Sequence, residues 1–261
     1  MTPLAHDLPV LVAGRDWPTG IRTVCSLREG GVSAAPYDTL NLGLHVQDDP
    51  ACVQRNRERL AQACGARPVF LDQVHGVTCL AIDGQTPNGL QADACWTAQS
   101  GVVCTILVAD CLPVLLCDAQ GRVVAAAHAG WRGLGAGVLE VTVQTLCEQA
   151  SCGPDAVHAW LGPCIGPAAF EVGDDVLRAW GESSETASAW FQPSGQPNKW
   201  LADLAGAARH RLQRCGVARI EGNDSTPAWC TVTQSKRFFS HRRDGRSGRF
   251  AAGIWREPGR V

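Results

Sequence analysis

Residues 101–137 read GVVCTILVADCLPVLLCDAQGRVVAAAHAGWRGLGAG and carry the clearest strand pattern in the chain. Gly101–Asp110 is a nearly unbroken apolar run, which is typical of a strand buried on both faces. Two more apolar segments, Pro113–Cys117 and Arg122–His128, flank the polar turn Asp118–Gly121. We therefore expect a buried strand followed by an antiparallel hairpin.

Helices and strands alternate along the rest of the chain. Apolar spacing, capping residues and stop signals predict helices over Ala51–Cys64, Leu134–Ala150 and Trp200–Arg214. Short strands are predicted at Pro68–Leu71, Val77–Ile82 and Val157–Leu161. Gly181–Asn198 is rich in serine and is predicted to be an inserted loop. This mixture favours an α/β or α+β fold with mixed sheets over a purely parallel sheet.

The composition is that of a globular protein. The chain has 261 residues, with 23 Lys and Arg against 25 Asp and Glu, and a net charge of -2. This balance gives no overall attraction to nucleic acid or to an anionic membrane, and 45% apolar residues argue against disorder. The apolar runs are too short for a membrane span, and residues 1–12 lack the features of a signal peptide. We therefore expect a cytoplasmic protein.

Cysteine is frequent, with 13 residues, and Cys-x-x-Cys does not occur. Its absence argues against zinc ribbons and thioredoxin-like redox sites. In a long chain without an export signal, we expect most of these cysteines to be reduced and buried as small apolar side chains, without structural disulfides.

The hairpin makes a prediction about two side chains. With its turn centred between Ala119 and Gln120, Cys111 and His128 lie opposite each other, with Cβ atoms roughly 4.5–5.5 Å apart. A bulge at Pro113 would break this register. The separation suits two ligands of one metal, or a thiolate–imidazole pair.

A third candidate ligand, His75, lies in the polar turn Asp72–Gly76 between two predicted strands. Polar loops held by a rigid sheet are common places for site residues. Zinc accepts a His–Cys–His set, and three protein ligands leave a fourth position for water or substrate. The alternative is a cysteine hydrolase, with Cys111 as nucleophile and His128 as base.

The glycine-rich turn Ala129–Gly137 joins the hairpin to the next predicted helix and contains Arg132. Backbone N–H groups and this guanidinium could hold a phosphate. The turn lacks the spacing of a Walker loop and of Gly-x-Gly-x-x-Gly. Close packing of the helix on the sheet is the alternative explanation of these glycines.

The segment Lys236–Arg249 contains six basic residues and one acid. It could be a solvated loop, an RNA-binding segment, or an anion clamp in which Arg242 or Arg243 folds back to the site. RNA binding is the least favoured of these, because the rest of the chain has no basic surplus.

Two acidic residues flank the candidate site. Asp93 is expected in a loop or turn, and Asp110 could cap a helix, support a ligand or act as a general base. The Gly-x-Ser-x-Gly elbow, His-Glu-x-x-His and the zinc deaminase signature are all absent from the sequence. Elbow-type serine hydrolases, common zincins and standard zinc nucleobase deaminases therefore lose support.

Several motifs occur in an order and spacing that suggest a known family. They are NLGLH from Asn41, DQVHG from Asp72, ADA from Ala92, ADCLPV from Ala109, HAGWRG from His128, GPCIGP from Gly162, FEVG from Phe170 and RRDG from Arg242. From about Arg22 to Trp255, the chain resembles the YfiH/laccase-domain family. The resemblance implies a single-domain α/β (α+β) sandwich with mixed sheets and a cysteine-hydrolase-like, YfiH-like fold over residues 1–261.

The resemblance also implies a chemistry. Zinc would be held by His75, Cys111 and His128, and these residues together with Asp93 are the expected catalytic residues. The implied activity is that of a purine nucleoside phosphorylase acting on adenosine, inosine and methylthioadenosine, with an adenosine deaminase activity. Family members have also been described as multicopper polyphenol oxidases and linked to the editing of peptidoglycan precursors.

Substrate or phosphate binding is expected from five residues: Asn41, Gln73, Arg132, Arg242 and Arg243. His241 stands where the resemblance leads us to expect tyrosine, so its role stays open. The expected ligands are a nucleoside and phosphate, not nucleic acid or membrane, bound by a monomer or homodimer.

The rival functions differ in their chemical requirements. A multicopper oxidase needs more grouped histidine ligands than seven scattered histidines supply, so copper is less suited than zinc. An amide hydrolase that edits peptidoglycan precursors would use Cys111 as its nucleophile. A non-catalytic module stabilised by zinc would have a closed coordination shell.

Overall fold

Two mixed sheets stacked face to face form the centre of the protein. The computed structural model describes residues 8–181 and 190–258. One sheet has the strand order β13-β9-β7-β8-β5-β4, with bounds Arg219–Gly222, Val157–Leu161, Leu112–Asp118, Val124–Ala129, Ala94–Thr97 and Cys79–Ala81. The other has the order β1-β2-β14-β6-β3, with bounds Val10–Leu11, Ile21–Ser26, Phe250–Arg256, Val102–Val108 and Arg67–Phe70. Each sheet contains parallel and antiparallel pairs, so the predicted mixed α/β architecture is confirmed.

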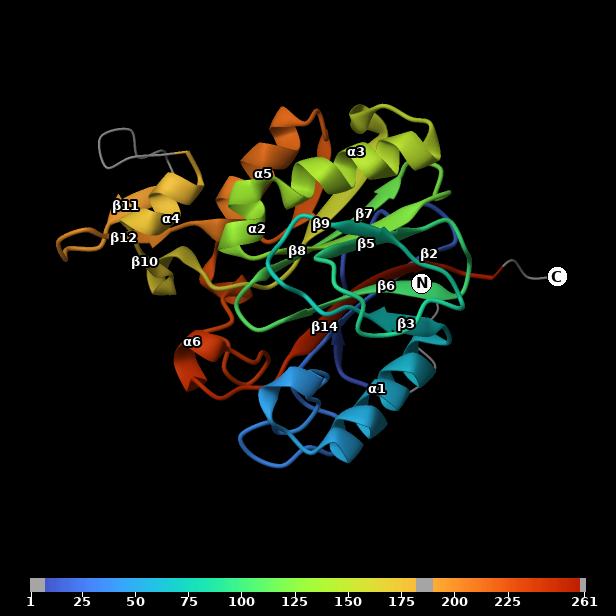
Figure 1. The fold of residues 1–261 in the computed structure, drawn as a ribbon, viewed down its shortest axis with the longest axis horizontal. Coiled ribbons are helices and arrows are strands. Elements are labelled where there is room, and N and C mark those ends of the chain that lie inside the picture. The colour runs from blue at the N-terminus through green and yellow to red at the C-terminus, as the bar shows by residue number, and fades with distance from the viewer. Residues whose placement is uncertain (1–7, 182–189, 259–261) are drawn as a thin grey trace.

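Helices cover the outer faces of both sheets (Figure 1). The helix α1 (Pro50–Cys64) lies on the five-stranded sheet, whereas α3 (Val138–Ala150) and α5 (Leu204–Arg214) lie on the six-stranded sheet. The remaining helices and 3-10 turns are α2 (Trp131–Ala136), α4 (Asp174–Ala179), α6 (His241–Asp244), η1 (Leu44–Val46), η2 (Pro154–Ala156), η3 (Pro167–Ala169) and η4 (Pro227–Trp229). A small antiparallel sheet contains β10 (Glu171–Gly173), β12 (Lys199–Ala202) and β11 (Phe191–Pro193). None of the described helices is long and apolar enough to cross a membrane.

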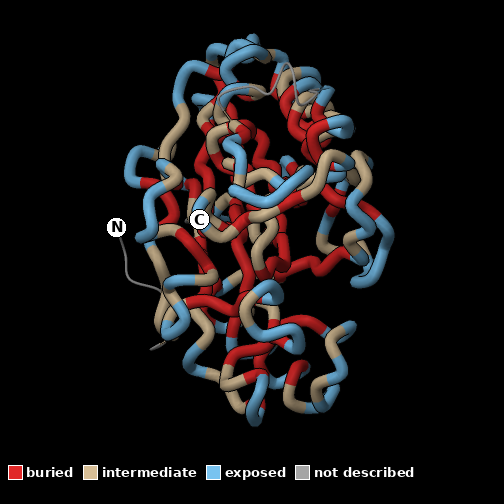
Figure 2. Tube along the Cα trace, turned by 90° about the vertical axis from the view of Figure 1, so that its left-hand side faces the viewer, coloured by how far each residue is buried: buried red, intermediate tan, exposed pale blue. Residues whose placement is uncertain are grey.

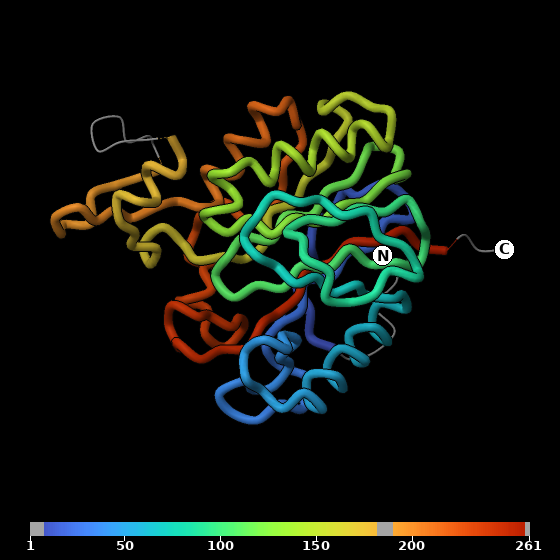
Figure 3. The backbone as a smooth tube through the Cα atoms, in the orientation of Figure 1, coloured from blue at the N-terminus to red at the C-terminus, as the bar shows by residue number. Residues whose placement is uncertain are grey.

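The stacked sheets explain the nearly continuous apolar runs in the sequence. On β7, Leu115 and Cys117 pack between the two sheets, while Val114 and Leu116 pack under the helices. Both faces of this strand are therefore buried, and alternation with polar residues is absent. Figure 2 shows the resulting buried centre. In Figure 3, strand β2 near the N-terminus and strand β14 near the C-terminus lie side by side. Their pairing joins β1 and β2 to the rest of the five-stranded sheet.

Several predicted elements are confirmed. The helix predicted over Ala51–Cys64 is α1, where the Asp49 side chain accepts a hydrogen bond from the Ala51 N–H at 2.9 Å. Gly65 ends this helix in the left-handed region, with φ at 59°. The predicted strands at Pro68–Leu71, Val77–Ile82 and Val157–Leu161 are present as β3, β4 and β9.

Two predicted helices have different bounds in the structure. The helix expected over Leu134–Ala150 breaks at Gly137, where φ is 99°, and is divided between α2 and α3. The helix expected from Trp200 begins only at Leu204, because Lys199–Ala202 pairs as β12 and Asp203 caps the helix. The loop predicted over Gly181–Asn198 contains β11, and its residues 182–189 lie outside the described residues.

The register of the β7–β8 hairpin also differs from the prediction. Pro113, not Cys111, pairs with His128. The Asp118 carboxylate accepts hydrogen bonds from three backbone N–H groups of the turn, at 2.7 to 3.2 Å. The turn is therefore wider than a two-residue hairpin, and its centre lies one residue further along the chain. The predicted direct pairing of Cys111 with His128 is wrong.

Candidate functional site

Three side chains with metal-binding atoms meet at one end of the stacked sheets. His75 comes from the turn before β4, Cys111 from the connection between β6 and β7, and His128 from β8. Their ligand atoms all lie within 4.8 Å of one another, and Cys111 Sγ is 3.7 Å from His75 Nε2. The two imidazole rings meet edge to face with centroids 4.8 Å apart. The structure thus brings together the three residues that sequence analysis grouped, and their chemical role stays a prediction.

Cys111 and His128 approach each other diagonally across the hairpin. Extending the observed register places Gly130 opposite Cys111. A Cβ atom on Gly130 would lie 2.6 Å from His75 Cδ2 and 3.1 Å from Cys111 Sγ. Because real Cβ atoms do not approach so closely, glycine is needed here for the thiol and imidazole to meet. Gly130 is therefore a positioning residue, whereas sequence analysis assigned it only to a glycine-rich turn.

One buried carboxylate, Asp93, fixes both histidines. It accepts hydrogen bonds from the backbone N–H groups of Val74, His75 and Gly76 at 3.2, 2.8 and 2.6 Å. Its Oδ1 also lies 2.8 Å from His128 Nδ1. Asp93 is fully buried directly before β5, and both of its oxygens already bind protein donors. The expected loop or turn position of Asp93 is confirmed, and the geometry is that of a positioning residue.

The electrostatics of the cluster favour a thiolate beside an imidazolium. Burial raises the pKa of the Cys111 thiol, but the charge and hydrogen bond of His128, with the hydrogen bond of His75, outweigh burial and lower it to about 6. Burial lowers the pKa of His128, but the Cys111 thiolate and Asp93 raise it to about 9. Burial also opposes ionisation of Asp93, yet its hydrogen bonds and the charge of His128 hold its pKa below the ordinary value.

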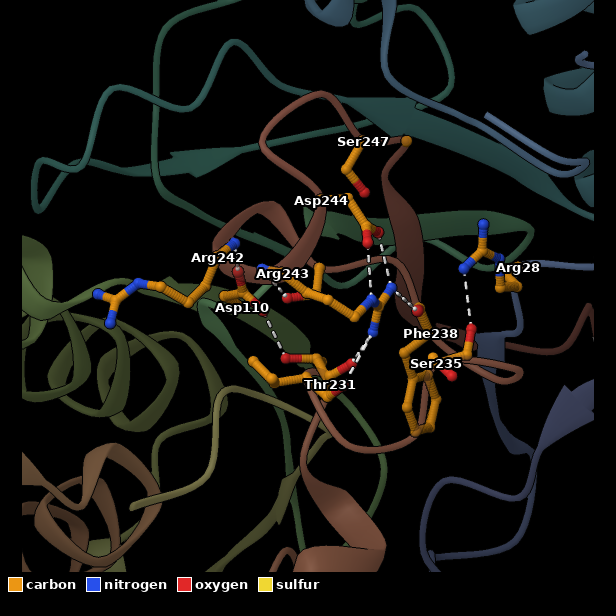
Figure 4. Close-up of polar contacts among 12 residues, drawn as sticks. Arg28, Asp110, Thr231, Ser235, Phe238, Arg242, Arg243, Asp244 and Ser247 are labelled. Carbon is orange, nitrogen blue, oxygen red and sulfur yellow. Dashed lines mark hydrogen bonds and ion pairs between the residues drawn. The ribbon is translucent and has the colours of Figure 1, made fainter. Parts of the chain in front are cut away.

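Asp110 ties the connection that carries Cys111 to the C-terminal segment (Figure 4). Its Oδ1 accepts a hydrogen bond from the Thr231 hydroxyl at 2.6 Å, and its Oδ2 accepts one from the Arg242 backbone N–H at 2.7 Å. Of the three roles left open for Asp110, the structure therefore shows binding to the first turn of a helix, α6. Asp110 and His75 both adopt the left-handed backbone region, with φ at 92° and 62°, which is uncommon for residues with a Cβ atom.

Two residues expected to bind substrate are instead engaged within the protein. The Gln73 side chain donates to the Leu107 carbonyl and accepts from the Leu107 N–H, each at 2.8 Å. The buried Asn41 accepts hydrogen bonds from the N–H groups of Gly43 and Arg249. These bonds occupy the amide oxygens and hold neighbouring backbone in place, and the expected substrate contacts of Asn41 and Gln73 stay a prediction.

The three arginines expected to bind phosphate differ in their surroundings. Arg132 is exposed and its guanidinium stacks on the Trp131 ring at 4.0 Å. Arg242 is also exposed, and its Nη1 donates to the carbonyls of Ala169 and Glu171. The whole guanidinium of Arg243 is engaged with three backbone carbonyls and the Asp244 carboxylate (Figure 4). The guanidinium donors of Arg243 are thus used within the protein, and its anion-binding role stays a prediction.

The glycine-rich turn serves close packing. A Cβ atom on Gly133 would lie 2.9 Å from the Gly76 carbonyl oxygen, and one on Gly135 would lie 2.5 Å from the Ala179 carbonyl oxygen. Most of this segment is itself the helix α2, which has only six residues and so offers little of the dipole expected for a phosphate cradle. The alternative explanation of these glycines is the one that the structure supports.

Two basic residues near the cluster were not singled out from the sequence. Burial lowers the pKa of His45, and the nearby charges of Arg249 and His128 lower it further. Arg249 lies within electrostatic range of Cys111 and Asp110. His45 closes the NLGLH motif and Arg249 ends the basic segment, so position in these two motifs was the available signal.

The donor set can hold a transition metal. A thiolate and two imidazoles are soft and borderline ligands, and they approach from three separate elements. His128 Nδ1 is bound to Asp93, which leaves Nε2 to face the cluster. A carboxylate behind a histidine ligand is the usual arrangement around protein-bound metals.

Two stacked mixed sheets with helices outside, and a His–Cys–His cluster at one end, define a mixed α/β protein with a candidate metal centre. The chain belongs to the multi-copper polyphenol oxidoreductase laccase family, whose model matches residues 22–257. The resemblance to the YfiH/laccase-domain family is thereby confirmed.

Relatives and solved structures agree with this assignment along nearly the whole chain. A protein of Pseudomonas aeruginosa, named a purine nucleoside phosphorylase, is 48% identical over 92% of this chain and 96% of its own length. The Escherichia coli protein named purine nucleoside phosphorylase YfiH is 48% identical over 91% of this chain and 95% of its own length. A crystal structure from Neisseria meningitidis, assigned to the family model DUF152, has a TM-score of 0.86 and 42% identity, covering 95% of this chain and 99% of that one.

Proposed function

We propose that this protein is a zinc-dependent purine nucleoside phosphorylase that acts on adenosine, inosine and methylthioadenosine. The observation that carries the proposal is full-length similarity, at 48% identity, to proteins named for this activity. The His–Cys–His cluster and the cationic residues around it supply groups that the reaction needs. We expect a cytoplasmic monomer or homodimer whose ligands are a small nucleoside and phosphate.

In this proposal, His75, Cys111 and His128 hold the zinc ion, and Asp93 orients His128. Zinc is the metal that best suits one thiolate and two imidazoles in a site with a free position. When bound, it would supply Lewis-acid polarisation of a ligand oxygen. Asp93 keeps the Nδ1 proton on His128, so Nε2 is the ligand atom.

Phosphorolysis also requires an anion site beside the nucleoside. Arg132 and Arg242 are exposed cations on elements that border the cluster, and both remain candidate phosphate ligands. Guanidinium groups suit this role because two N–H groups can bind two phosphate oxygens. Adenosine deamination, the proposed side activity, needs no phosphate and would use the same nucleoside site.

The arrangement of Cys111, His128 and Asp93 favours a second candidate, a cysteine-type amide hydrolase. Asp93 binds His128 Nδ1, and the other ring nitrogen faces the Cys111 thiol, as in nucleophile–base–carboxylate triads. In that case Cys111 would form a covalent acyl adduct and turnover would not depend on phosphate.

The deciding experiment is an assay of adenosine with and without inorganic phosphate, with products separated by chromatography. The phosphorylase proposal expects adenine and ribose 1-phosphate only when phosphate is present. Release of free ribose at the same rate without phosphate would refute it. A covalent adduct on Cys111, detected by mass spectrometry with an amide substrate, would support the hydrolase instead.

A further inference from the structure

In the basic segment Lys236–Arg249, the last arginine, Arg249, lies near the His–Cys–His cluster. The guanidinium groups of the segment's other arginines make different contacts, and Arg242, which donates through Nη1 only, stays a candidate phosphate ligand. Arg237 stacks on Phe238, Arg242 binds two carbonyls near β10, Arg243 binds the C-terminal segment, and Arg246 donates to the Tyr37 hydroxyl and the Gln47 carbonyl. Arg249 lies within electrostatic range of the cluster thiol, Cys111, and of Asp110.

The β14–β6 pairing fixes where Arg249 lies. Phe250 pairs with Val108 at the end of the antiparallel ladder. One residue further, the register brings Arg249 beside Ala109, two residues before Cys111. The Leu42 N–H donates to the Arg249 carbonyl at 3.0 Å, which joins this position to the NLGLH segment. Arg249 thus stands where the five-stranded sheet meets the cluster.

The backbone around Arg249 is built to hold its side chain. Asn41 Oδ1 accepts hydrogen bonds from the N–H groups of Arg249, at 2.8 Å, and Gly43, at 2.9 Å. A Cβ atom on Gly43 would lie 2.8 Å from Arg249 Cγ and 3.2 Å from its Cβ. The aliphatic stem therefore packs directly on the glycine backbone. Asn41 and Gly43 restrict where the guanidinium can go.

The guanidinium keeps donors for a ligand. Its Nη1 donates to the carbonyls of Ser247 and Gly248 at 3.0 and 3.1 Å. Within residues 8–181 and 190–258, its Nε and Nη2 donate no hydrogen bond. Asp110 attracts Arg249 electrostatically, but its carboxylate oxygens bind Thr231 and the Arg242 N–H. A half-buried cation with free donors beside a reactive centre is suited to an anion.

We propose that Arg249 binds the phosphate co-substrate next to the His–Cys–His cluster. This inference rests on the proposed phosphorylase function and names a residue for its anion site. In the reaction, a phosphate oxygen forms a bond to C1′ of the ribose while the bond from C1′ to the purine nitrogen breaks. The electron pair of that bond goes to the purine, and the proton carried by hydrogen phosphate ends on the departing base. Arg249 orients the phosphate and stabilises its charge.

The test compares Arg249→Gln and Arg249→Lys with Arg214→Gln, a matched loss of charge at an exposed position on α5. The Michaelis constant for phosphate is measured with adenosine, and the affinity for inorganic phosphate is measured separately by titration calorimetry. Zinc content and the unfolding midpoint show whether each variant is intact.

We expect Arg249→Gln to raise the phosphate KM by about 10–100-fold, because a charge-assisted bidentate contact is lost. Arg249→Lys should lie between Arg249→Gln and the wild type, and Arg214→Gln should equal the wild type. A phosphate KM within twofold of the wild type in both folded, zinc-loaded Arg249 variants would overturn the inference. Loss of zinc from both variants with an unchanged calorimetric affinity for phosphate would overturn it too, because Arg249 would then support only the Cys111 thiolate. If Arg249→Gln does not fold, Arg249→Lys decides by the same criterion.

Failure of this inference can be separated from failure of the proposed function. If the wild type shows no phosphorolysis but binds phosphate, and Arg249→Gln weakens that binding at least tenfold, the anion site stands and the phosphorylase proposal fails. If the wild type does carry out phosphorolysis and phosphate binding is unchanged in Arg249→Gln, the function stands and the inference fails.

Discussion

Asp93→Asn replaces the buried carboxylate that holds the cluster together by a neutral amide of the same shape. The carboxylate has four donors, the N–H groups of Val74, His75 and Gly76 and the ring of His128. An asparagine oxygen in the place of Oδ1 still accepts from His75 and His128. Its amide N–H₂ then faces the N–H groups of Val74 and Gly76, which lose their acceptor.

The magnitude follows from these two orphaned donors. A buried donor without an acceptor costs about 1–3 kcal/mol, so the free energy of unfolding should fall by about 2–6 kcal/mol. The metal affinity should fall by about 10–100-fold, because a neutral amide accepts from His128 more weakly than a carboxylate and leaves the imidazole a less basic ligand. Both quantities are accessible, the first by urea unfolding in the presence of a chelator and the second by competition with a chromophoric chelator.

The pH dependence gives an independent check on the same carboxylate. The pKa of Asp93 is lowered in the folded protein, so its stabilisation is present above the unfolded pKa of about 3.9 and is lost as the pH falls through the folded value. The wild type should therefore lose more stability on acidification than Asp93→Asn does. Asp72→Asn is the control, since Asp72 is exposed in the same turn. A fall below about 1 kcal/mol in Asp93→Asn, with unchanged metal affinity, would refute the reasoning.

Three further predictions concern the cluster. Cys111→Ala should reduce zinc far below one ion per chain by elemental analysis, and full retention would remove Cys111 as a ligand. Gly130→Ala should lower both metal content and thermal stability, because its methyl group would meet His75 and Cys111, whereas Gly84→Ala, which meets nothing closer than 3.5 Å, should change neither measurably. In metal-free native protein, iodoacetamide should modify Cys111 before the other thiols, at a rate that falls as the pH drops through about 6, as followed by peptide mass spectrometry. Uniform alkylation of several thiols would contradict the lowered pKa of Cys111.

The sequence was most informative where a single periodicity or cap determines the structure. The strand runs around Val102–Val108 and the capped helix Pro50–Cys64 could be predicted because local apolar pattern and turn chemistry agree there. Pairing between distant strands is different. Strand β14 completes its sheet between β2 and β6, and no local pattern in residues 250–256 indicates those neighbours.

The candidate site shows the same limit at finer scale. The alternation of side chains along the hairpin was sufficient to place Cys111 and His128 on one face. A shift of the turn centre by one residue moves each pairing by two residues, so the same side chains stay on the same face. Which residue stands opposite Cys111 depended on Asp118, whose side chain widens the turn. That is side-chain chemistry within a loop, and strand spacing alone cannot reveal it.

The roles of the polar residues near the cluster depend on long-range contacts in a similar way. Asn41 and Gln73 lie in motifs that also contain or adjoin site residues, and from sequence both were expected to touch substrate. Their partners, Arg249 and Leu107, are 208 and 34 residues away along the chain. Each side-chain amide binds backbone groups at or beside the end of a distant strand. Asn41 and Gln73 therefore help to fix the positions of the chain segments around the site.

The cluster is assembled by carboxylates that join separate parts of the chain. Asp93 links the turn of His75 to the strand of His128, and Asp110 links the connection of Cys111 to α6. Asp93 accepts the backbone N–H groups around the left-handed turn at His75, whereas Asp110, itself in the left-handed region, accepts the Arg242 N–H of α6 and the Thr231 hydroxyl. Hydrogen bonds within the protein therefore fix the His75 turn, the His128 ring and the connection that carries Cys111. A metal that binds here would find its donors already close together, unlike a metal site whose ligands are gathered only when the chain folds around the ion.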